Sequence, residues 1–447
     1  MRLLTFSAVR SALIATGMFG LGMLGFVAQA SSDLELSAGP MYEAWSKEDS
    51  VLACCLKVQA PADAATRRRP IQVVLALDVS RQTAGTPLKA IKEAAMLVAN
   101  GLHDGDRLAV VAFSDFGRTV FSMQQLNASS RKVAAKAITT LREEAGRNVG
   151  AGLDKAQAEL MRHKNTNLAG RYLLLLTIGD ATKGSQSPHK LLSRASTLHD
   201  KHDIAISTLG FSTYDVLGTK VNLNEDLLRD MALNHDGRYY FVEELENASS
   251  FMGLELELIS EASARQVRIE INTQSDATIT NVAGARQSGK VLLVGDMRPG
   301  QCRRVVFDLA NRPERERDVI LNAVYIEPGG FTERRLRSYV RIPLTSGSRR
   351  LDREFGPFLA VFDLQEDLAH TAEHIKDNRR EYLTMYRSRV TRLEQENNNL
   401  GSAYIADQLK YYQTFERRLD DTAVWAEILI MHTKFRLLRL LYGIEKL

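Results

Sequence analysis

The chain of 447 residues is poor in cysteine and has little net charge. Its three cysteines, Cys54, Cys55 and Cys302, form none of the paired spacings that hold zinc. Neighbours on a strand point to opposite faces, so either Cys54 or Cys55 could pair with Cys302, or all three could be small buried apolar residues. The formal net charge of +4 falls to +2 without Arg2 and Arg10, which argues against nucleic acid or anionic lipid as a ligand.

The sequence also lacks the short motifs of common enzyme classes. It contains no phosphate-binding loop, dinucleotide fingerprint or nucleophile elbow. Asp78 and Ser80 stand close together, but no histidine is placed to act as the base for a serine nucleophile. We therefore predict a protein without enzymatic activity and without catalytic residues.

The N-terminus has the pattern of a targeting segment. Arg2 and Arg10 precede an apolar run over 11–27, and Ala28-Gln29-Ala30 fits a small-x-small cleavage site. The run is shorter than the roughly 20 residues that a membrane-spanning helix needs. Residues 1–30 therefore predict a cleaved signal peptide and an exported protein, periplasmic or extracellular, with an uncleaved N-terminal membrane anchor as the alternative.

Residues 70–263 alternate between strand and helix patterns. Strands that are apolar throughout are predicted at 71–79, 171–179 and 204–211, and amphipathic helices such as 87–102 separate them. Continuous apolar strands with helices between them indicate a mainly parallel sheet covered on both faces, which is a doubly wound α/β fold. In such a sheet, ligands bind at the carboxyl ends of the strands.

A second region has an all-β pattern. Short strands with Gly, Pro and Asn between them follow over 264–346, which predicts a β-sandwich. The segment 50–61, before the α/β region, is also strand-like, so we assign 31–69 to the same sandwich. The α/β domain would then be inserted between the first strand of the sandwich and the remaining strands.

The last region, 350–447, is predicted to be helical. A short heptad seam is formed by Leu383, Tyr386, Val390, Leu393, Asn397 and Leu400. The segment 397–402 would end one helix, so two helices of about 40 residues in an antiparallel hairpin are expected, with coiled-coil character. Because an asparagine in such a seam can set register and partner number, self-assembly as a homo-oligomer is an alternative role. Charged residues in the apolar stretch 424–442 argue against a membrane span.

One short string suggests a metal enzyme. His370, Glu373 and His374 fit the H-x-x-E-H pattern of inverted zinc metallopeptidases, and histidines four positions apart share one helix face. Glu445 is the one glutamate near the downstream distance of a third ligand. Since the region does not resemble the fold of those enzymes, we expect a solvated helix face, with a zinc metallopeptidase as the weakest alternative.

Three landmarks follow one another in the α/β region: VVLALDVS (73–80), GRNVGAGL (146–153) and LLLLTIGDATKG (173–184). They resemble the three metal-site loops of the von Willebrand factor A domain, with the elements that carry them. VGDMRPGQCRRVVFDL (294–309) resembles the β-sandwich that accompanies such domains in secreted bacterial proteins. The resemblance implies a Rossmann-like fold and a role in binding other proteins.

The resemblance also implies a metal-ion-dependent adhesion site, in which Mg²⁺ on oxygen ligands accepts a carboxylate from a partner protein. The family pattern is Asp-x-Ser-x-Ser on the first loop, Thr on the second and Asp on the third. Position by position, this chain keeps Asp78 and Ser80. It has Gln82 at the second serine, Arg147 at the threonine and Ile178 at the aspartate.

Arg147 is the most damaging of these changes because a guanidinium has five donors and no acceptor. At about 5 Å and an effective dielectric of about 20, its charge would oppose a divalent ion by roughly 6–7 kcal/mol. Ile178 removes a carboxylate, although Gln82 still offers a carbonyl oxygen. We therefore predict a degenerate site with no magnesium and no other cofactor, in which Arg147 takes the place of the cation and pairs with Asp78.

Two other arrangements of these loops stay open. Arg147 could face solvent while Asp78 bonds to its own loop. Alternatively, Asp78 and Ser80 could hold a metal in an altered geometry, together with Gln82 and Asp180.

The sequence as a whole predicts an exported, non-enzymatic interaction or adhesion protein with a protein partner. The partner-binding face would lie at the carboxyl ends of the strands and include Arg81, Asp115, Arg147 and Asp180. Arg81 and Arg147 would attract an acidic side chain directly, through charge-assisted hydrogen bonds.

Overall fold

The computed structural model describes residues 33–46, 50–61, 69–163, 167–211, 223–242, 245–273, 277–311, 317–327, 332–345, 350–374 and 379–419. All of them belong to the second of the chain's two compact units, residues 31–447. The predicted signal peptide, residues 1–30, and Glu445 lie outside the described residues. So do the side chains of His370, Glu373 and His374, whose backbone belongs to a helix.

A six-stranded sheet forms the centre of the α/β domain, with strand order β6-β5-β4-β7-β8-β9. The strands are β4 (Ile71–Asp78), β5 (Arg107–Phe113), β6 (Gly117–Gln125), β7 (Gly170–Thr177), β8 (Ile204–Phe211) and β9 (Tyr239–Val242). Neighbouring strands are parallel except β5 and β6. The strand order reverses between β4 and β7, and this switch point is where such sheets bind ligands.

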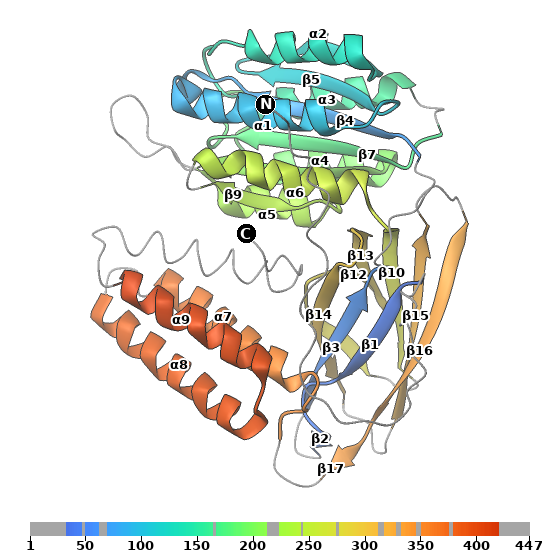
Figure 1. Ribbon diagram of the computed structural model, residues 1–447, viewed down its shortest axis with the longest axis vertical. Coiled ribbons are helices and arrows are strands. Elements are labelled where there is room, and N and C mark those ends of the chain that lie inside the picture. The colour runs from blue at the N-terminus through green and yellow to red at the C-terminus, as the bar shows by residue number, and fades with distance from the viewer. Residues whose placement is uncertain are drawn as a thin grey trace, which may run out of the picture. The chain divides into compact units, whose positions relative to one another are not determined.

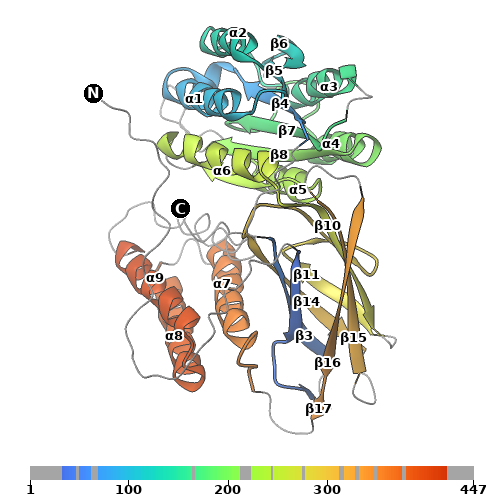
Figure 2. The ribbon, with the colours of Figure 1, turned by 45° about the vertical axis from the view of Figure 1, so that its right-hand side comes forward.

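Helices cover both faces of this sheet (Figures 1 and 2). One face packs against α1 (Thr86–Gly101), α2 (Ala128–Thr139) and α6 (Ala248–Ser260), and the other against α3 (Val149–Leu160), α4 (Pro188–His202) and α5 (Glu225–Leu233). Short 3₁₀ turns occur at η1 (Arg81–Thr83), η2 (Met161–His163) and η3 (Leu245–Asn247). Along β4, Leu75 and Leu77 join one core while Val74 and Ala76 join the other, which is why the strand is apolar throughout. The predicted doubly wound α/β fold is confirmed.

The β-sandwich is built from strands on both sides of the α/β domain in the sequence. Its sheets have the orders β1-β3-β14-β11 and β12-β13-β10-β15-β16. The strands are β1 (Glu35–Pro40), β3 (Val51–Gln59), β10 (Ala264–Thr273), β11 (Thr278–Ala283), β12 (Arg286–Ser288), β13 (Val291–Met297), β14 (Cys302–Ala310), β15 (Arg317–Ile326) and β16 (Glu333–Ile342), with a small parallel pair of β2 (Trp45–Ser46) and β17 (Leu344–Thr345). Because β3 pairs with β14 along its whole length, the predicted insertion is confirmed.

The cysteines lie on β3 and β14, and among the described residues none of them forms a disulfide. The strand register places Cys302 opposite Gln59 rather than opposite Cys54 or Cys55. Burial raises the pKa of the Cys55 thiol to about 12, and it raises the pKa of Cys54 further. These two residues therefore act as small apolar groups of the core.

The C-terminal region is helical, as predicted, and its described part contains α7 (Gly356–His374), α8 (Arg379–Leu400) and α9 (Ala403–Leu419). α8 and α9 form the expected hairpin, with Gly401 at a positive φ of 62° in the turn. The prediction of a first helix of about 40 residues is wrong, because α7 and α8 are separate elements that pack against each other. Both carry aromatic residues, such as Phe358 and Tyr382, which are buried in one shared core. No described helix is both long and apolar enough to cross a membrane.

The heptad seam is used within the chain. Tyr386, Val390 and Leu393 are buried in the core that α7, α8 and α9 share with the sandwich. Asn397 Oδ1 accepts a hydrogen bond from the Ser402 amide at 3.0 Å, so this residue closes the turn after α8 instead of setting the register of a seam. Oligomerisation stays a prediction, but this seam does not support it.

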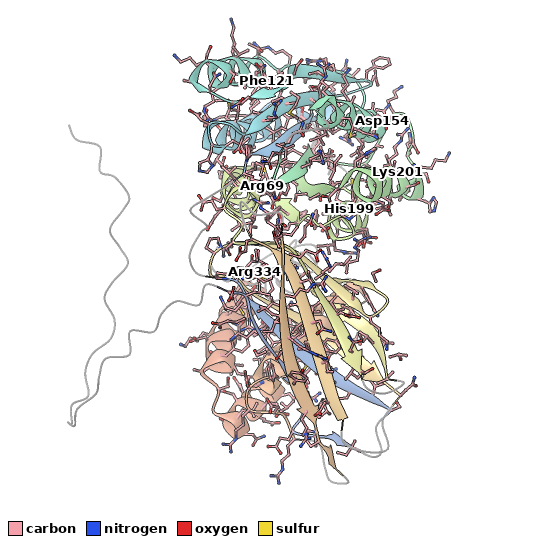
Figure 3. The ribbon with its side chains drawn as sticks, turned by 90° about the vertical axis from the view of Figure 1, so that its right-hand side faces the viewer. Arg69, Phe121, Asp154, His199, Lys201 and Arg334 are labelled. Atoms are coloured by element: carbon pink, nitrogen blue, oxygen red, sulfur yellow. The ribbon has the colours of Figure 1, made fainter. Side chains whose placement is uncertain are left out.

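A polar network joins the α/β domain to the sandwich. The Tyr172 hydroxyl donates to Asp296 Oδ2 at 2.6 Å, and Arg265 forms an ion pair with the same carboxylate at 3.0 Å. Burial raises the pKa of the Tyr172 hydroxyl well above its ordinary value. His199 on α4, labelled in Figure 3, lies 3.2 Å from Arg286 Nη2 at the start of β12. Tyr172 is near the N-terminal end of β7, whereas Asp78 lies at the C-terminal end of β4. The network therefore lies at the opposite end of the parallel strands from Asp78.

Candidate functional site

The ends of β4 and β7 lie side by side at the switch point of the sheet. Asp78 and Thr177 are the last residues of these two parallel strands. The loop that carries Arg147 reaches the same place, because the Asn148 amide donates to the Ser114 carbonyl at the end of β5 at 2.7 Å. Asn148 is also the N-cap of α3, so its position is set by the start of that helix.

Asp78 is fully buried and accepts three hydrogen bonds. Its Oδ1 accepts from the Ser80 amide at 2.9 Å. Its Oδ2 accepts from the Thr177 hydroxyl at 2.8 Å and from the Ile178 amide at 3.2 Å. Both carboxylate oxygens are therefore occupied by donors from the chain itself.

Arg147 is 2% exposed and its guanidinium lies beside Asp78. Its Nε is 3.9 Å from Asp78 Oδ2 and donates to the Asp180 carbonyl at 2.6 Å. Its Nη1 donates to Gln82 Oε1 at 3.0 Å and approaches Ser80 Oγ at 3.4 Å. Burial lowers the pKa of Arg147, while the charges of Asp78 and Asp180 act against that shift. The guanidinium thus connects the β4 loop to the loop after β7, and it does not face solvent.

The predicted metal-site positions come together, but Ile178 takes part through its backbone. Its amide donates to Asp78, while its side chain is fully buried in the hydrophobic core on the α1 side of the sheet. The oxygens of Ser80 and Gln82 point at the guanidinium. The Asp180 carboxylate faces elsewhere and accepts from the Asn224 amide at 2.7 Å.

Two residues of the predicted partner face, Arg81 and Asp115, form no hydrogen bond or ion pair with Arg147 in the described part of the chain. Arg81 is exposed at the start of η1. Asp115 lies in the turn after β5, where its amide donates to the Ala145 carbonyl at 3.0 Å. Asp115 Oδ1 is buried and has no hydrogen-bond donor. These two residues are therefore not part of the buried pair of Asp78 and Arg147.

Thr177 and Thr182 belong to the site and were missed by sequence reasoning. The Thr177 hydroxyl donates to Asp78, and the Thr182 hydroxyl accepts from the Arg147 amide at 3.0 Å. Both hydroxyls lie in the segment already matched to the third metal loop. A threonine that ends a strand next to a buried carboxylate is the signal that would have identified the first of them.

The residues present do not fit a divalent cation. A hard ion such as Mg²⁺ needs converging oxygen ligands, whereas here the oxygens of Ser80 and Gln82 converge on a guanidinium that repels it. Asp78 has no oxygen without a donor, and Ile178 offers none. Among the described residues, no group of three or more His, Cys, Asp or Glu side chains is placed to hold a metal.

Comparison with known proteins identifies the α/β domain. The family model for the von Willebrand factor type A domain matches residues 72–253. An uncharacterized protein of Synechocystis sp., sll0103, is 29% identical over 188 residues, which is 42% of this chain and 41% of that protein. The E3 ubiquitin-protein ligase WAVH1 of Arabidopsis thaliana is 29% identical over 126 residues, 27% of this chain and 18% of the ligase. The chain therefore spans less than half the length of either relative.

Two solved structures share the fold over most of the chain. The von Willebrand factor type A protein from Catenulispora acidiphila has a TM-score of 0.64 at 15% identity, covering 87% of this chain and 90% of its own. The ArnB paralog VWA2 from Sulfolobus acidocaldarius has a TM-score of 0.58 at 12% identity, covering 90% and 97%. These structures show the shared fold, and the match to the family model shows that residues 72–253 carry a von Willebrand factor type A (vWA) domain, a member of a family of protein-interaction and adhesion domains.

Proposed function

We propose that this chain is an exported, non-enzymatic protein that binds a partner protein at the carboxyl ends of the vWA strands without using a metal. The observation that carries the proposal is the guanidinium of Arg147, which is buried 3.9 Å from Asp78. It supplies one positive charge where the family pattern has an ion. That charge balances Asp78 and bonds to Gln82 and the Asp180 backbone.

In this proposal Arg147 and Arg81 have different roles. With 2% of its surface exposed, Arg147 has little area to offer to a partner, so it orders the loops around Asp78. Arg81 is exposed on the adjoining turn and forms no ion pair with a described residue. An acidic side chain of the partner would therefore meet Arg81, with a charge-assisted hydrogen bond in place of a coordination bond.

Calorimetric titration with magnesium tests the metal-free site. We expect no heat of binding from the wild-type chain at millimolar magnesium. A variant that restores the family pattern, Gln82→Ser with Arg147→Thr and Ile178→Asp, serves as the positive control for the assay. Micromolar magnesium binding by the wild-type chain would overturn the proposal.

Export rests on the N-terminal pattern, in which two arginines precede an apolar run and a small-x-small site ends at Ala30. N-terminal sequencing of the protein from its native host tests this part. A mature chain that starts at Ser31 is expected. A chain that keeps residues 1–30 and fractionates with the membrane would favour the anchor.

A further inference from the structure

Phe116 is the most exposed large hydrophobic residue among the described residues, at 80%. It stands at the tip of the turn between β5 and β6, next to the loops around Asp78. Val133 and Tyr339, the other two such residues, are 56% and 63% exposed and lie on α2 and β16. Covering a phenylalanine ring with an apolar surface is energetically favourable. At 80% exposure, the ring of Phe116 is left largely uncovered by the described residues.

The turn that presents Phe116 is held rigidly by its neighbours. The Ser114 amide donates to the Phe116 carbonyl at 3.1 Å, and Asn148 Nδ2 donates to the Asp115 carbonyl at 3.2 Å. A side chain on Gly117 would meet the Ala151 carbonyl oxygen at 2.3 Å, so the turn lies directly against the first turn of α3. Because the backbone of this turn is already ordered, binding of a partner here would cost little conformational entropy. This favours Phe116 as an anchor residue.

Lysine side chains lie beside the turn that carries Phe116. A Cβ built on Gly146 would lie 1.7 Å from Asp115 Oδ1 and 2.9 Å from Lys183 Cγ. Lys183 therefore lies close to Asp115, the residue that precedes Phe116 in the turn. Lys183 is exposed and, like Arg81, forms no ion pair with a described residue. In contrast, Arg118 is bound to Glu144 at 2.8 Å. Lys155 also lies beside this turn, because a Cβ on Gly117 would meet Lys155 Cβ at 3.0 Å, and it forms no ion pair with a described residue. Lys183, Lys155 and Arg81 are therefore available to a partner.

We propose that Phe116 is the anchor residue of the docking surface and that the partner is a protein with an apolar pocket whose rim carries carboxylates. The phenyl ring enters the pocket, and Lys183 and Arg81 pair with the rim. Aromatic anchors that become fully buried dominate binding, whereas rim charges act mainly on association rate and salt dependence. This inference rests on the proposed function, because it assigns a partner to the same end of the sheet.

Site-specific photocrosslinking in the full chain tests the inference. We would place p-benzoylphenylalanine separately at Phe116, Arg81 and Val133, irradiate each protein in an extract of the native host, and identify the captured proteins. Position 133 is the control for an exposed apolar residue of the same domain. The captured protein would then be purified and its affinity measured. We expect capture of one protein from positions 116 and 81 and none from 133.

With the purified partner, Phe116→Ala should weaken binding about 30-fold, or about 2 kcal/mol, while Phe116→Tyr stays within about threefold. Higher salt should slow association. Two results would overturn this inference and leave the proposed function intact. One is capture from position 81 alone, and the other is an affinity of Phe116→Ala for the partner equal to that of the wild-type chain. Capture from neither position would overturn both.

Discussion

Replacing Arg147 by methionine tests whether its charge keeps Asp78 stable inside the domain. Methionine removes the charge and the donors and keeps much of the apolar length. In the native chain both groups are buried, and Arg147 Nε lies 3.9 Å from Asp78 Oδ2. At an effective dielectric of about 20, unit charges at that distance attract by about 4 kcal/mol. The variant leaves the carboxylate buried without that attraction.

Three hydrogen bonds to Asp78 survive the change, from Ser80, Thr177 and Ile178, and they offset part of the loss. Breaking one side of a buried ion pair costs about 3–5 kcal/mol, and we expect the lower end of this range for Arg147→Met. Urea unfolding would show it as a lower midpoint at an unchanged slope. Asp78→Asn should also destabilise the domain, and the double variant should lose about 2–3 kcal/mol less than the sum of the two single variants.

A matched control is Arg118→Met, which breaks the half-exposed pair with Glu144 at 2.8 Å. Exposed pairs contribute about 1 kcal/mol or less, so this variant should stay close to the native midpoint. The reasoning is refuted if Arg147→Met costs no more than Arg118→Met. It is also refuted if the coupling between positions 147 and 78 is below about 0.5 kcal/mol.

Three further predictions concern Gly146, Tyr172 and His235. Gly146→Ala should lower the free energy of unfolding by about 1–3 kcal/mol, because φ is +70° and a Cβ would meet Asp115 Oδ1 at 1.7 Å; thermal unfolding measures it. Tyr172→Phe should cost about 1–2 kcal/mol in urea unfolding by removing the hydrogen bond to Asp296. Burial lowers the pKa of His235, so between its folded pKa and about 6.5 the unfolded chain binds more protons. His235 therefore contributes full stability above that range and loses it as the pH falls, and His235→Gln should flatten this part of a stability-pH curve.

The α/β fold was predictable because its strands are buried on both faces and leave long apolar runs in the sequence. Helical periodicity was less informative at the C-terminus. It indicated a helical region but not where one helix ends, and α7 and α8 are separate helices that pack on each other. Asn397 was misread for a related reason, since an asparagine in a heptad position and an asparagine that closes a turn look alike until the partner amide of Ser402 is known.

At the candidate site, the sequence predicted which positions meet but not how each one contributes. Asp78, Ser80, Gln82 and Arg147 were placed by their resemblance to the metal-site loops of the vWA domain, and their side chains do contact one another. Ile178 was expected to matter through its missing carboxylate, yet it contributes a backbone amide. Backbone donors are the same for every residue type except proline, so no sequence pattern could have shown this role.

The buried guanidinium changes what the binding surface can supply. A metal with an open position forms a coordination bond to one carboxylate, so a single contact can dominate recognition. The guanidinium of Arg147 already interacts within the chain: it pairs with Asp78 and donates hydrogen bonds to Gln82 and to the Asp180 carbonyl. In the proposed function, recognition comes instead from exposed groups near the site, such as the ring of Phe116 and the charges of Arg81 and Lys183. Affinity should therefore follow the apolar area covered, and a chelator of divalent ions should leave it unchanged.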